Sequence, residues 1–130
     1  KHLARHKQAD LFLDTFPCNA HTTASDALWA GLPLLTQQGQ TFPGRVAASL
    51  LQAIGLPELI AKNQDEYVAL AIEYGKNAEK LAQIKQKLAS NRLTTPLFNT
   101  AEFTKHLENI FSQMVTRQHA KLAPTDIHIS

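Results

Sequence analysis

Four side chains in one short stretch have the chemistry to bind an anionic ligand: His21, Thr22, Thr23 and Asp26. The sequence predicts a helix that begins at Thr22 or Thr23, with one of these threonines as its N-cap and Asp26 in its first turn. The first amides of a helix have no intrahelical acceptor and lie at the positive end of its dipole. A phosphate placed there would gain hydrogen bonds from these amides, from the threonine hydroxyls and from His21. Asp26 would repel the phosphate but suits a ribose diol further along.

These residues belong to a stretch, Leu11–Thr36, that predicts a βαβ unit. Its first three residues are apolar and end at Asp14, which is the pattern of a buried parallel strand. The polar loop Thr15–His21 contains the turn former Asn19, and a Gly-Leu-Pro stop after the helix leads into a second short strand, Pro33–Thr36. Ligands of open α/β sheets bind at the carboxyl ends of the strands, where Asp14 is expected.

The rest of the chain predicts a scaffold that is mainly helical. The apolar stripes of its helices are interpreted as core. We expect three parts: the βαβ portion at residues 1–62, helices at 63–122 and an extended or disordered tail at 123–130. The expected elements after the βαβ unit are a helix over Pro43–Ile54, a further helical turn in Leu56–Ala61, and helices that begin near Asn63, Asn77 and Asn99 or Thr100.

Composition excludes several classes of protein. The chain has 130 residues, of which 44% are hydrophobic and 18% charged, and its net charge of +2 gives no case for binding nucleic acid. Its apolar runs are too short to span a bilayer. The single cysteine, Cys18, excludes an internal disulfide, indicates a cytoplasmic location and is interpreted as a small buried hydrophobe. Because the chain begins at Lys1 without a methionine, we expect it to be part of a longer protein.

The patterns alone leave plainer interpretations open. Thr22 can be a simple helix cap, His21 a loop residue and Arg45 a surface cation, none of them with a role in binding. The chain contains no glycine-rich phosphate loop of either common type. The basic start, Lys1–Lys7, is interpreted as a solvated helix end. Because the second half carries amphipathic helices, a non-enzymatic helical interaction module is a second candidate.

A long string of motifs nevertheless resembles one family. The string comprises DLFLDTFPCNAHTTASDALWAGLPLLT, followed by GRVAASLL, GLPELIAKNQDEY and TTPLFNT. It closely resembles the O-linked N-acetylglucosamine transferase family, which includes plant SPINDLY-type proteins and bacterial homologues with tetratricopeptide repeats. The resemblance extends from His2 to about Met114.

The resemblance implies an α/β fold, namely part of the C-terminal Rossmann-like lobe of a GT-B glycosyltransferase, followed by several packed α-helices. It implies an inverting transfer of N-acetylglucosamine from UDP-N-acetylglucosamine to Ser or Thr hydroxyls of proteins, with no metal and no other cofactor. A related donor, GDP-fucose or UDP-glucose, is the alternative within the fold. The HTTxxD string argues against a nucleotide-sugar epimerase.

The resemblance also implies which residues bind the donor. His2 and Arg5 match family residues that contact its uracil end, and Asp26 matches the acidic residue that bonds to the ribose. The family's HTT segment, which binds the diphosphate and approaches the sugar, corresponds to His21, Thr22 and Thr23.

Two residues of the loop are expected near the sugar. Cys18 falls where the family lines the pocket for the N-acetyl group, and Ala20 stands where the family has glycine, which narrows that pocket. The family's phosphate-neutralising lysine, its proposed base and its acceptor-binding repeats all match segments upstream of Lys1. We therefore expect no transferase activity from this chain alone. The sequence leaves the acceptor proteins and the oligomeric state open.

Overall fold

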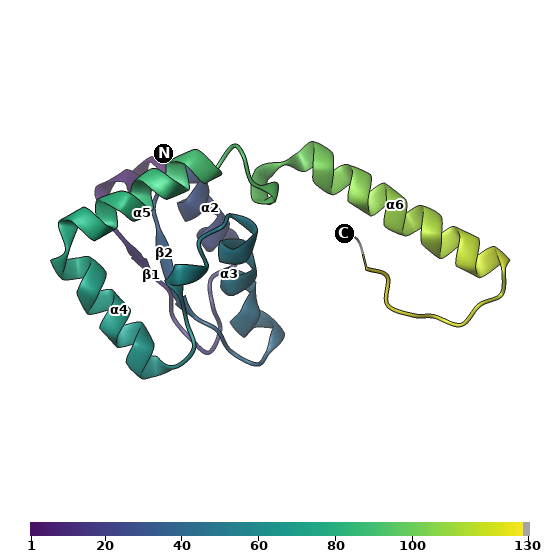
Figure 1. Ribbon diagram of the computed structural model, residues 1–130, viewed down its shortest axis with the longest axis horizontal. Coiled ribbons are helices and arrows are strands. Elements are labelled where there is room, and N and C mark those ends of the chain that lie inside the picture. The colour runs from purple at the N-terminus through teal and green to yellow at the C-terminus, as the bar shows by residue number, and fades with distance from the viewer. Residues whose placement is uncertain (129–130) are drawn as a thin grey trace. The chain divides into compact units, whose positions relative to one another are not determined.

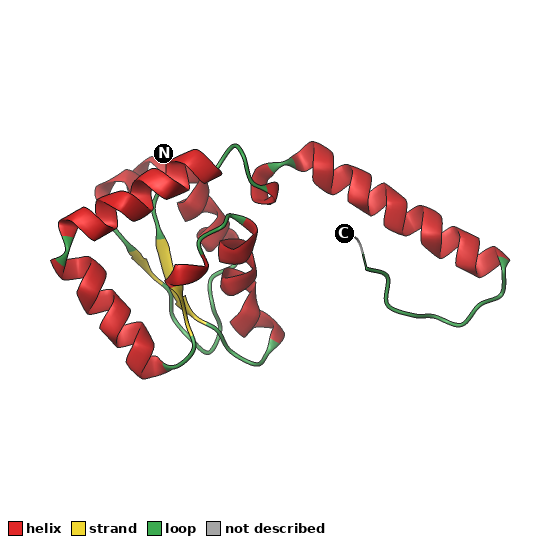
Figure 2. Cartoon of the chain, viewed as in Figure 1, coloured by secondary structure: helices red, strands yellow, loops and turns green. Residues whose placement is uncertain are grey.

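The structure is a computed structural model that describes residues 1–128. The chain divides into two compact units, Lys1–Leu97 and Phe98–Ser130. The first unit has a three-stranded parallel sheet with helices on its two faces (Figures 1 and 2). The strands β1 (Phe12–Leu13), β2 (Leu34–Gln37) and β3 (Ile60–Ala61) lie in the order β1-β2-β3. The predicted α/β class is therefore confirmed.

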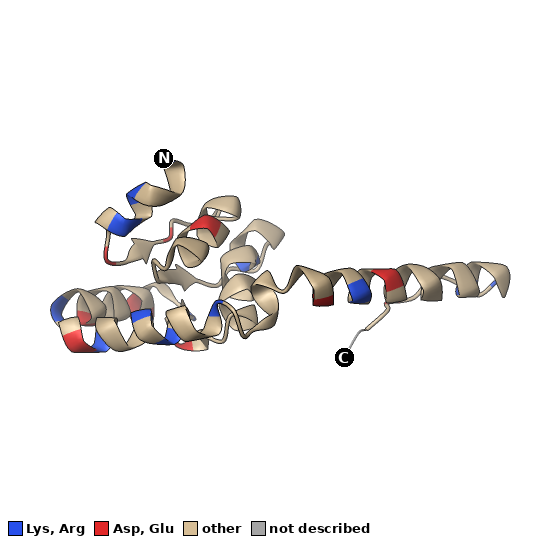
Figure 3. Ribbon diagram, turned by 90° about the horizontal axis from the view of Figure 1, so that it is seen from above, with Lys and Arg blue, Asp and Glu red and all other residues tan. Residues whose placement is uncertain are grey.

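The helices of this unit form two layers around the sheet. Helices α1 and α2 lie on one face, and α4 and α5 lie on the other (Figure 3). The helical elements are α1 (His2–Arg5), α2 (Thr22–Ala30), α3 (Phe42–Ala53), α4 (Gln64–Lys76) and α5 (Ala78–Asn91), with 3₁₀ turns η1 (His6–Gln8), η2 (Pro57–Leu59) and η3 (Pro96–Phe98), the last of which ends at the start of the second unit.

The central strand β2 forms the core of the sheet. Leu34, Leu35 and Thr36 have no solvent exposure. Leu34 pairs with Phe12 of β1, and Thr36 pairs with Ile60 of β3. A strand covered by helices on both faces must be apolar along its whole length, as the run Pro33–Leu35 is. Thr36 is therefore an unusual residue for its place, and its hydroxyl requires a hydrogen-bond partner.

The prediction of a further helical turn in Leu56–Ala61 is confirmed in part. The segment forms one 3₁₀ turn, η2, and then strand β3, which the sequence did not predict. Two paired residues are too few to show an alternating pattern, so this strand leaves no periodic signal in the sequence. Its parallel pairing with β2 depends on contacts with residues far away in the chain.

The predicted asparagine caps are confirmed. The side-chain oxygens of Asn63 and Asn77 accept hydrogen bonds from the amides of Glu66 and Lys80, each at 2.9 Å. Each cap satisfies an amide at the start of its helix that has no intrahelical partner. Asn77 also ends α4, so a single residue marks the corner between α4 and α5.

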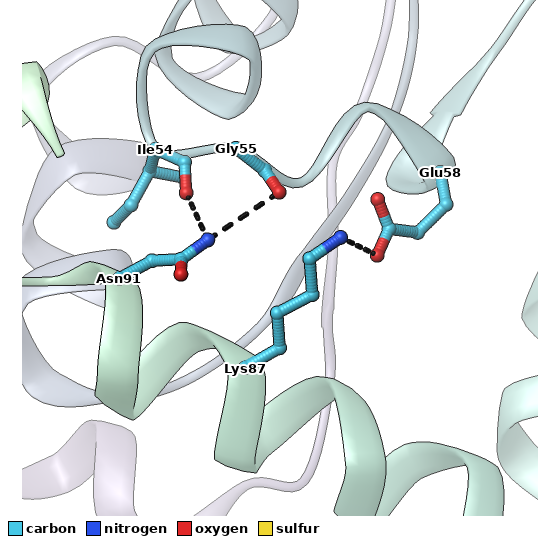
Figure 4. Close-up of polar contacts among 5 residues, drawn as sticks. All are labelled: Ile54, Gly55, Glu58, Lys87 and Asn91. Atoms are coloured by element: carbon cyan, nitrogen blue, oxygen red, sulfur yellow. Dashed lines mark hydrogen bonds and ion pairs between the residues drawn. The ribbon is translucent and has the colours of Figure 1, made fainter.

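The end of α5 is tied to the turn that follows α3 (Figure 4). The Asn91 amide nitrogen donates to the carbonyl oxygens of Ile54 at 2.8 Å and Gly55 at 3.4 Å. One turn earlier in α5, Lys87 forms an ion pair with Glu58 at 2.6 Å. Gly55 has a φ of +72°, and a Cβ added there would lie 2.9 Å from the Asn91 amide nitrogen.

Replacing Gly55 with alanine is expected to destabilise the first unit by about 1–3 kcal/mol, because it combines left-handed strain with loss of the Asn91 contacts. Gly75 is the matched control, since it lies in α4 and a Cβ added to it would meet no atom within 4 Å. Gly75→Ala should be neutral or stabilising. Hydrogen exchange of the α5 amides in the full-length protein measures both variants, and equal protection in the two would contradict the account.

The second unit contains helix α6 (Thr100–His119), which Asn99 caps as predicted by accepting from the Glu102 amide at 3.1 Å. The expectation that its stripe is core differs from the structure, since no residue of α6 is buried. A single helix cannot bury its own apolar face. The exposed side chains of the stripe are Phe103, Leu107, Phe111 and Met114.

Residues of the expected tail up to 128 have no regular secondary structure, and positions 129–130 of that tail lie outside the described residues. The predicted domain boundaries at 62 and 122 stay predictions.

Charged residues of both signs lie along α4 and α5 (Figure 3). Three ion pairs involve these helices: Lys80 with Glu73, Lys85 with Asp10 and Lys87 with Glu58. Such exposed pairs contribute little to stability. Among the helices of residues 1–128, none has the length and apolarity that crossing a membrane requires.

Candidate functional site

A hollow of about 510 Å³ lies at the carboxyl end of β1, beside the first turn of α2. It contains four of the seven predicted donor-binding residues: Cys18, His21, Thr22 and Thr23. The loop between β1 and α2, residues 14–21, forms most of its wall. The full lining is Phe12, Leu13, Asp14, Thr15, Cys18, Asn19, Ala20, His21, Thr22 and Thr23.

Helix α2 presents an open N-terminus to this hollow. Its N-cap is His21, whose side chain makes no capping bond, so the prediction that Thr22 or Thr23 is the N-cap was wrong. Both threonines are helical and exposed. The first intrahelical bond runs from the amide of Ser25 to the carbonyl of His21, at 3.1 Å. The amides of Thr22 and Thr23 precede that bond and are free of intrahelical partners.

The His21 ring is held by the segment that follows β2. Its Nε2 lies 3.4 Å from the carbonyl oxygen of Pro43, and the Phe42 ring meets it edge-on with centroids 6.0 Å apart. A carbonyl oxygen only accepts hydrogen bonds, so this contact requires a proton on Nε2. The other ring nitrogen, Nδ1, is thereby left for a ligand.

Two glycines allow a tight bend in the segment between β2 and α3. The Gly39 amide donates to the Gly44 carbonyl at 2.8 Å, and a Cβ on Gly44 would lie 3.1 Å from the Gly39 Cα. Thr41 caps α3 by accepting from the Gly44 amide at 3.3 Å. The bend fixes Pro43, and through it the position of the His21 ring.

Asp14 lines the hollow, but its carboxylate is hydrogen-bonded to the loop and to β2. Its Oδ1 accepts from the amides of Thr15 at 2.9 Å and Ala20 at 2.8 Å. Its Oδ2 accepts from the Asn19 side-chain amide at 2.9 Å and from the Thr36 hydroxyl at 2.6 Å. Asp14 is only 2% exposed. Asp14 therefore lies at the ligand-binding edge of the sheet, as predicted, but four protein donors occupy its carboxylate.

Two further contacts extend this network. The Asn19 side-chain nitrogen also lies 2.8 Å from the Thr36 hydroxyl oxygen and 3.0 Å from the carbonyl of Gln37. From α4, the Tyr67 hydroxyl donates to the Asp14 carbonyl at 2.7 Å. Burial, together with the negative charge of Asp14, raises the pKa of Tyr67 above its ordinary value, so the phenol keeps its proton.

Three other predicted residues lie on α1 and α2. His2 Nε2 is 3.3 Å from Asp26 Oδ2, so the structure brings these two together. Asp26 lies in the second turn of α2 and not the first as predicted, because the helix begins at Thr22. The His2–Asp26 pair is partly exposed and contributes little to stability. A ligand can therefore replace the contact between the two side chains. In the part of the chain that the structure describes, the Arg5 side chain has no hydrogen-bond or ion-pair partner.

Cys18 is exposed, which corrects the expectation of a buried thiol. It follows the exposed pair Phe16 and Pro17, and the loop buries the Asn19 side chain in its place. The thiol therefore faces solvent at the wall of the hollow. Residues 1–128 contain no cluster of three or more His, Cys, Asp or Glu side chains suited to hold a metal ion.

Sequence patterns missed the inward role of Asp14, and they missed Thr36 and Tyr67 altogether. One signal was available for Thr36, because a hydroxyl at the end of the apolar run Pro33–Leu35 must find a partner when buried. No signal was available for Tyr67, whose bond to Asp14 joins residues 53 positions apart.

Comparison with known proteins finds one matching family and several similar relatives. Residues 1–107 match the family described as Glycosyl transferase family 41. The chain is 38% identical over 130 residues to a Caenorhabditis elegans UDP-N-acetylglucosamine–peptide N-acetylglucosaminyltransferase, a match that covers all of this chain and 11% of that protein. It is 40% identical over 115 residues to a probable UDP-N-acetylglucosamine–peptide N-acetylglucosaminyltransferase, SEC, from Arabidopsis thaliana, a match that covers 88% of this chain and 12% of the relative.

A solved structure is also similar. The chain matches a Thermobaculum terrenum O-GlcNAc transferase mutant, K341M, with a TM-score of 0.81 and 34% identity. The match covers 87% of this chain and 22% of that one. The chain thus spans about a tenth of the length of the two relatives and about a fifth of the solved chain.

Proposed function

The chain belongs to glycosyl transferase family 41, and we propose that it forms the donor-binding part of an inverting protein O-glycosyltransferase. The reaction transfers N-acetylglucosamine from UDP-N-acetylglucosamine to Ser or Thr hydroxyls of an acceptor protein. The names of the two relatives, both UDP-N-acetylglucosamine–peptide N-acetylglucosaminyltransferases, support this donor over GDP-fucose and UDP-glucose.

One observation carries the proposal. The free amides of Thr22 and Thr23, their hydroxyls and the ring of His21 all border the hollow that also contains the exposed thiol of Cys18. Donors at an open helix terminus suit a diphosphate, and a small side chain beside them leaves room for an N-acetyl group. In this proposal, His2 and Arg5 bind the uracil end of the donor, and the Asp26 carboxylate accepts hydrogen bonds from the ribose hydroxyls.

In the proposed reaction these residues act on the leaving group. As the bond between the sugar and the β-phosphate oxygen breaks, negative charge grows on UDP. Amides and hydroxyls that are already fixed in place stabilise this charge without reorganising. With a proton on both ring nitrogens, His21 also donates from Nδ1 to the leaving group, while Nε2 keeps its contact with Pro43. The proposed reaction uses no metal, and the general base belongs to a segment outside this chain.

The single cysteine and the low net charge fit a protein of the reducing cytoplasm that binds a nucleotide sugar and a protein rather than nucleic acid. That location and those partners are part of the proposal.

Nucleotide-sugar titration of the full-length protein tests it. We expect UDP-N-acetylglucosamine and UDP to bind, GDP-fucose to fail, and UDP-glucose to bind more weakly because it lacks the N-acetyl group. Transfer to an acceptor protein should be unchanged by EDTA. Saturation-transfer NMR measures binding, and a radiolabelled sugar measures transfer. Tight binding of a guanine nucleotide with no binding of uridine would contradict UDP-N-acetylglucosamine as the donor.

A further inference from the structure

We propose that Asp14, Asn19 and Thr36 are positioning residues that fix the β1–α2 loop, so that the first turn of α2 meets the diphosphate of the donor. The inference rests on the proposed function, since it concerns the same site. None of the three is expected to touch the donor, because each is buried beneath the loop: Asp14 is 2%, Asn19 4% and Thr36 0% exposed.

A single oxygen atom closes the loop. Oδ1 of Asp14 accepts from the amide of Thr15, at the start of the loop, and from that of Ala20, just before His21. Because both amides bond to one atom, the path of the intervening residues is held at both ends. The N-terminus of α2 follows directly and takes its place from this closure.

The other carboxylate oxygen ties the closed loop to the sheet. Oδ2 of Asp14 accepts from the Thr36 hydroxyl of β2 and from the Asn19 side chain, and Asn19 reaches the carbonyl of Gln37 at 3.0 Å. β2 is the central strand and the most buried one. The loop is therefore anchored to β2, the central and most buried strand of the unit.

The network also divides the amides between two negative groups. A buried carboxylate is costly unless hydrogen bonds satisfy it. Asp14 takes the amides of Thr15 and Ala20, which leaves those of Thr22 and Thr23, beyond His21, for the phosphates. If the Asp14 carboxylate lost its partners on β2, it would compete for the same donors as the ligand.

The expected signature is specific to the diphosphate. A displaced loop weakens contacts to the phosphates, while the proposed uridine contacts come from His2 and Arg5 of α1 and from Asp26 in the second turn of α2, all outside the loop. Binding of UDP should therefore weaken more than binding of uridine. General destabilisation of the fold would weaken both ligands alike.

The test compares Thr36→Val with Thr36→Ser in the full-length protein. Valine has the shape of threonine without its hydroxyl, whereas serine keeps the hydroxyl. For Thr36→Val we expect about tenfold weaker UDP binding by isothermal titration, the size of one lost hydrogen bond to a charged group, with uridine binding by saturation-transfer NMR unchanged. Thr36→Ser should restore UDP binding to within about threefold of wild type, as expected when the hydrogen bond is kept.

Two further variants keep the test decisive. Thr95→Val removes a part-buried hydroxyl that is bonded to the Asn91 carbonyl at 2.8 Å and takes no part in the Asp14 network, so it should leave both ligands unaffected. Tyr67→Phe removes only the bond to the Asp14 carbonyl and should weaken UDP by about threefold, as for loss of one hydrogen bond, even if Thr36→Val fails to fold.

The outcomes separate the two proposals. Wild-type protein that binds no UDP overturns the proposed function and the inference with it. Wild-type protein that binds UDP, with Thr36→Val and Tyr67→Phe equal to it, overturns the inference alone. Equal weakening of UDP and uridine in these variants also overturns it, because that pattern reports a structural defect.

Discussion

Replacing His21 with alanine in the full-length protein is expected to lower the rate of sugar transfer by about 10²- to 10³-fold, the range for loss of one group that stabilises a developing negative charge. The imidazole is held on one side by the Pro43 carbonyl and by the Phe42 ring. Its Nδ1 is therefore fixed before the donor binds. Alanine removes this group and leaves the amides of α2 in place, so kcat should fall more than the affinity for UDP.

Steady-state kinetics with UDP-N-acetylglucosamine and an acceptor protein measures the effect. His119→Ala, at the exposed end of α6, is the control, and it should leave the rate unchanged. Melting temperatures of both variants should match the wild type, because the part-buried His21 side chain makes only a long contact with Pro43 at 3.4 Å and an edge-on contact with the Phe42 ring. A His21→Ala enzyme with a normal rate would show that this histidine has no part in the reaction.

The sequence predicted most of the first unit because its signals are local. The Gly-Leu-Pro stop after α2 is one example, since Gly31 ends the helix with a φ of +86°. The caps Asn63 and Asn77 are others, because each side chain bonds to an amide three residues later in the chain. Such signals need no knowledge of the rest of the fold.

The features that the sequence did not reveal depend on distant residues. Strand β3 exists because Ile60 and Ala61 pair with β2 across a gap of more than 20 positions. The threonines were predicted as caps because Ser and Thr favour that position, but His21 is the cap and Thr22 is the first residue of the helix. Local propensity cannot distinguish between neighbouring start points when two threonines follow one another.

The residues proposed to contact the donor were predicted from the sequence, but the buried network that holds their loop was not. The resemblance located His21, Thr22 and Thr23, and the structure places them together at one hollow. Asp14 was expected at the sheet edge, as observed, but the hydrogen bonds of its carboxylate to the loop and to β2 were not predicted. A carboxylate at a strand end can turn outward or inward, and only the positions of Asn19 and Thr36 decide between the two.

Shortening Leu35 to alanine is expected to be the most destabilising change in the first unit. Leu35 has no solvent exposure and lies in β2, where it pairs with Leu13. Removing a buried leucine side chain loses its transfer free energy and leaves a cavity, at a cost of about 2–5 kcal/mol. The next residue is Thr36, so loss of order in β2 should reach the Asp14 network and the loop above it.

Native-state hydrogen exchange of the β2 amides in the full-length protein measures this cost locally. Leu93→Ala is the matched control, because the Leu93 side chain is 76% exposed and its removal should change the opening free energy by less than about 0.5 kcal/mol. If Leu35→Ala left β2 as protected as Leu93→Ala does, β2 would not be the strand that holds the unit together. If β2 lost protection while UDP bound as in wild type, the loop would have to take its position from some element other than β2. The two measurements on one variant therefore separate the stability of the sheet from its role in positioning the site.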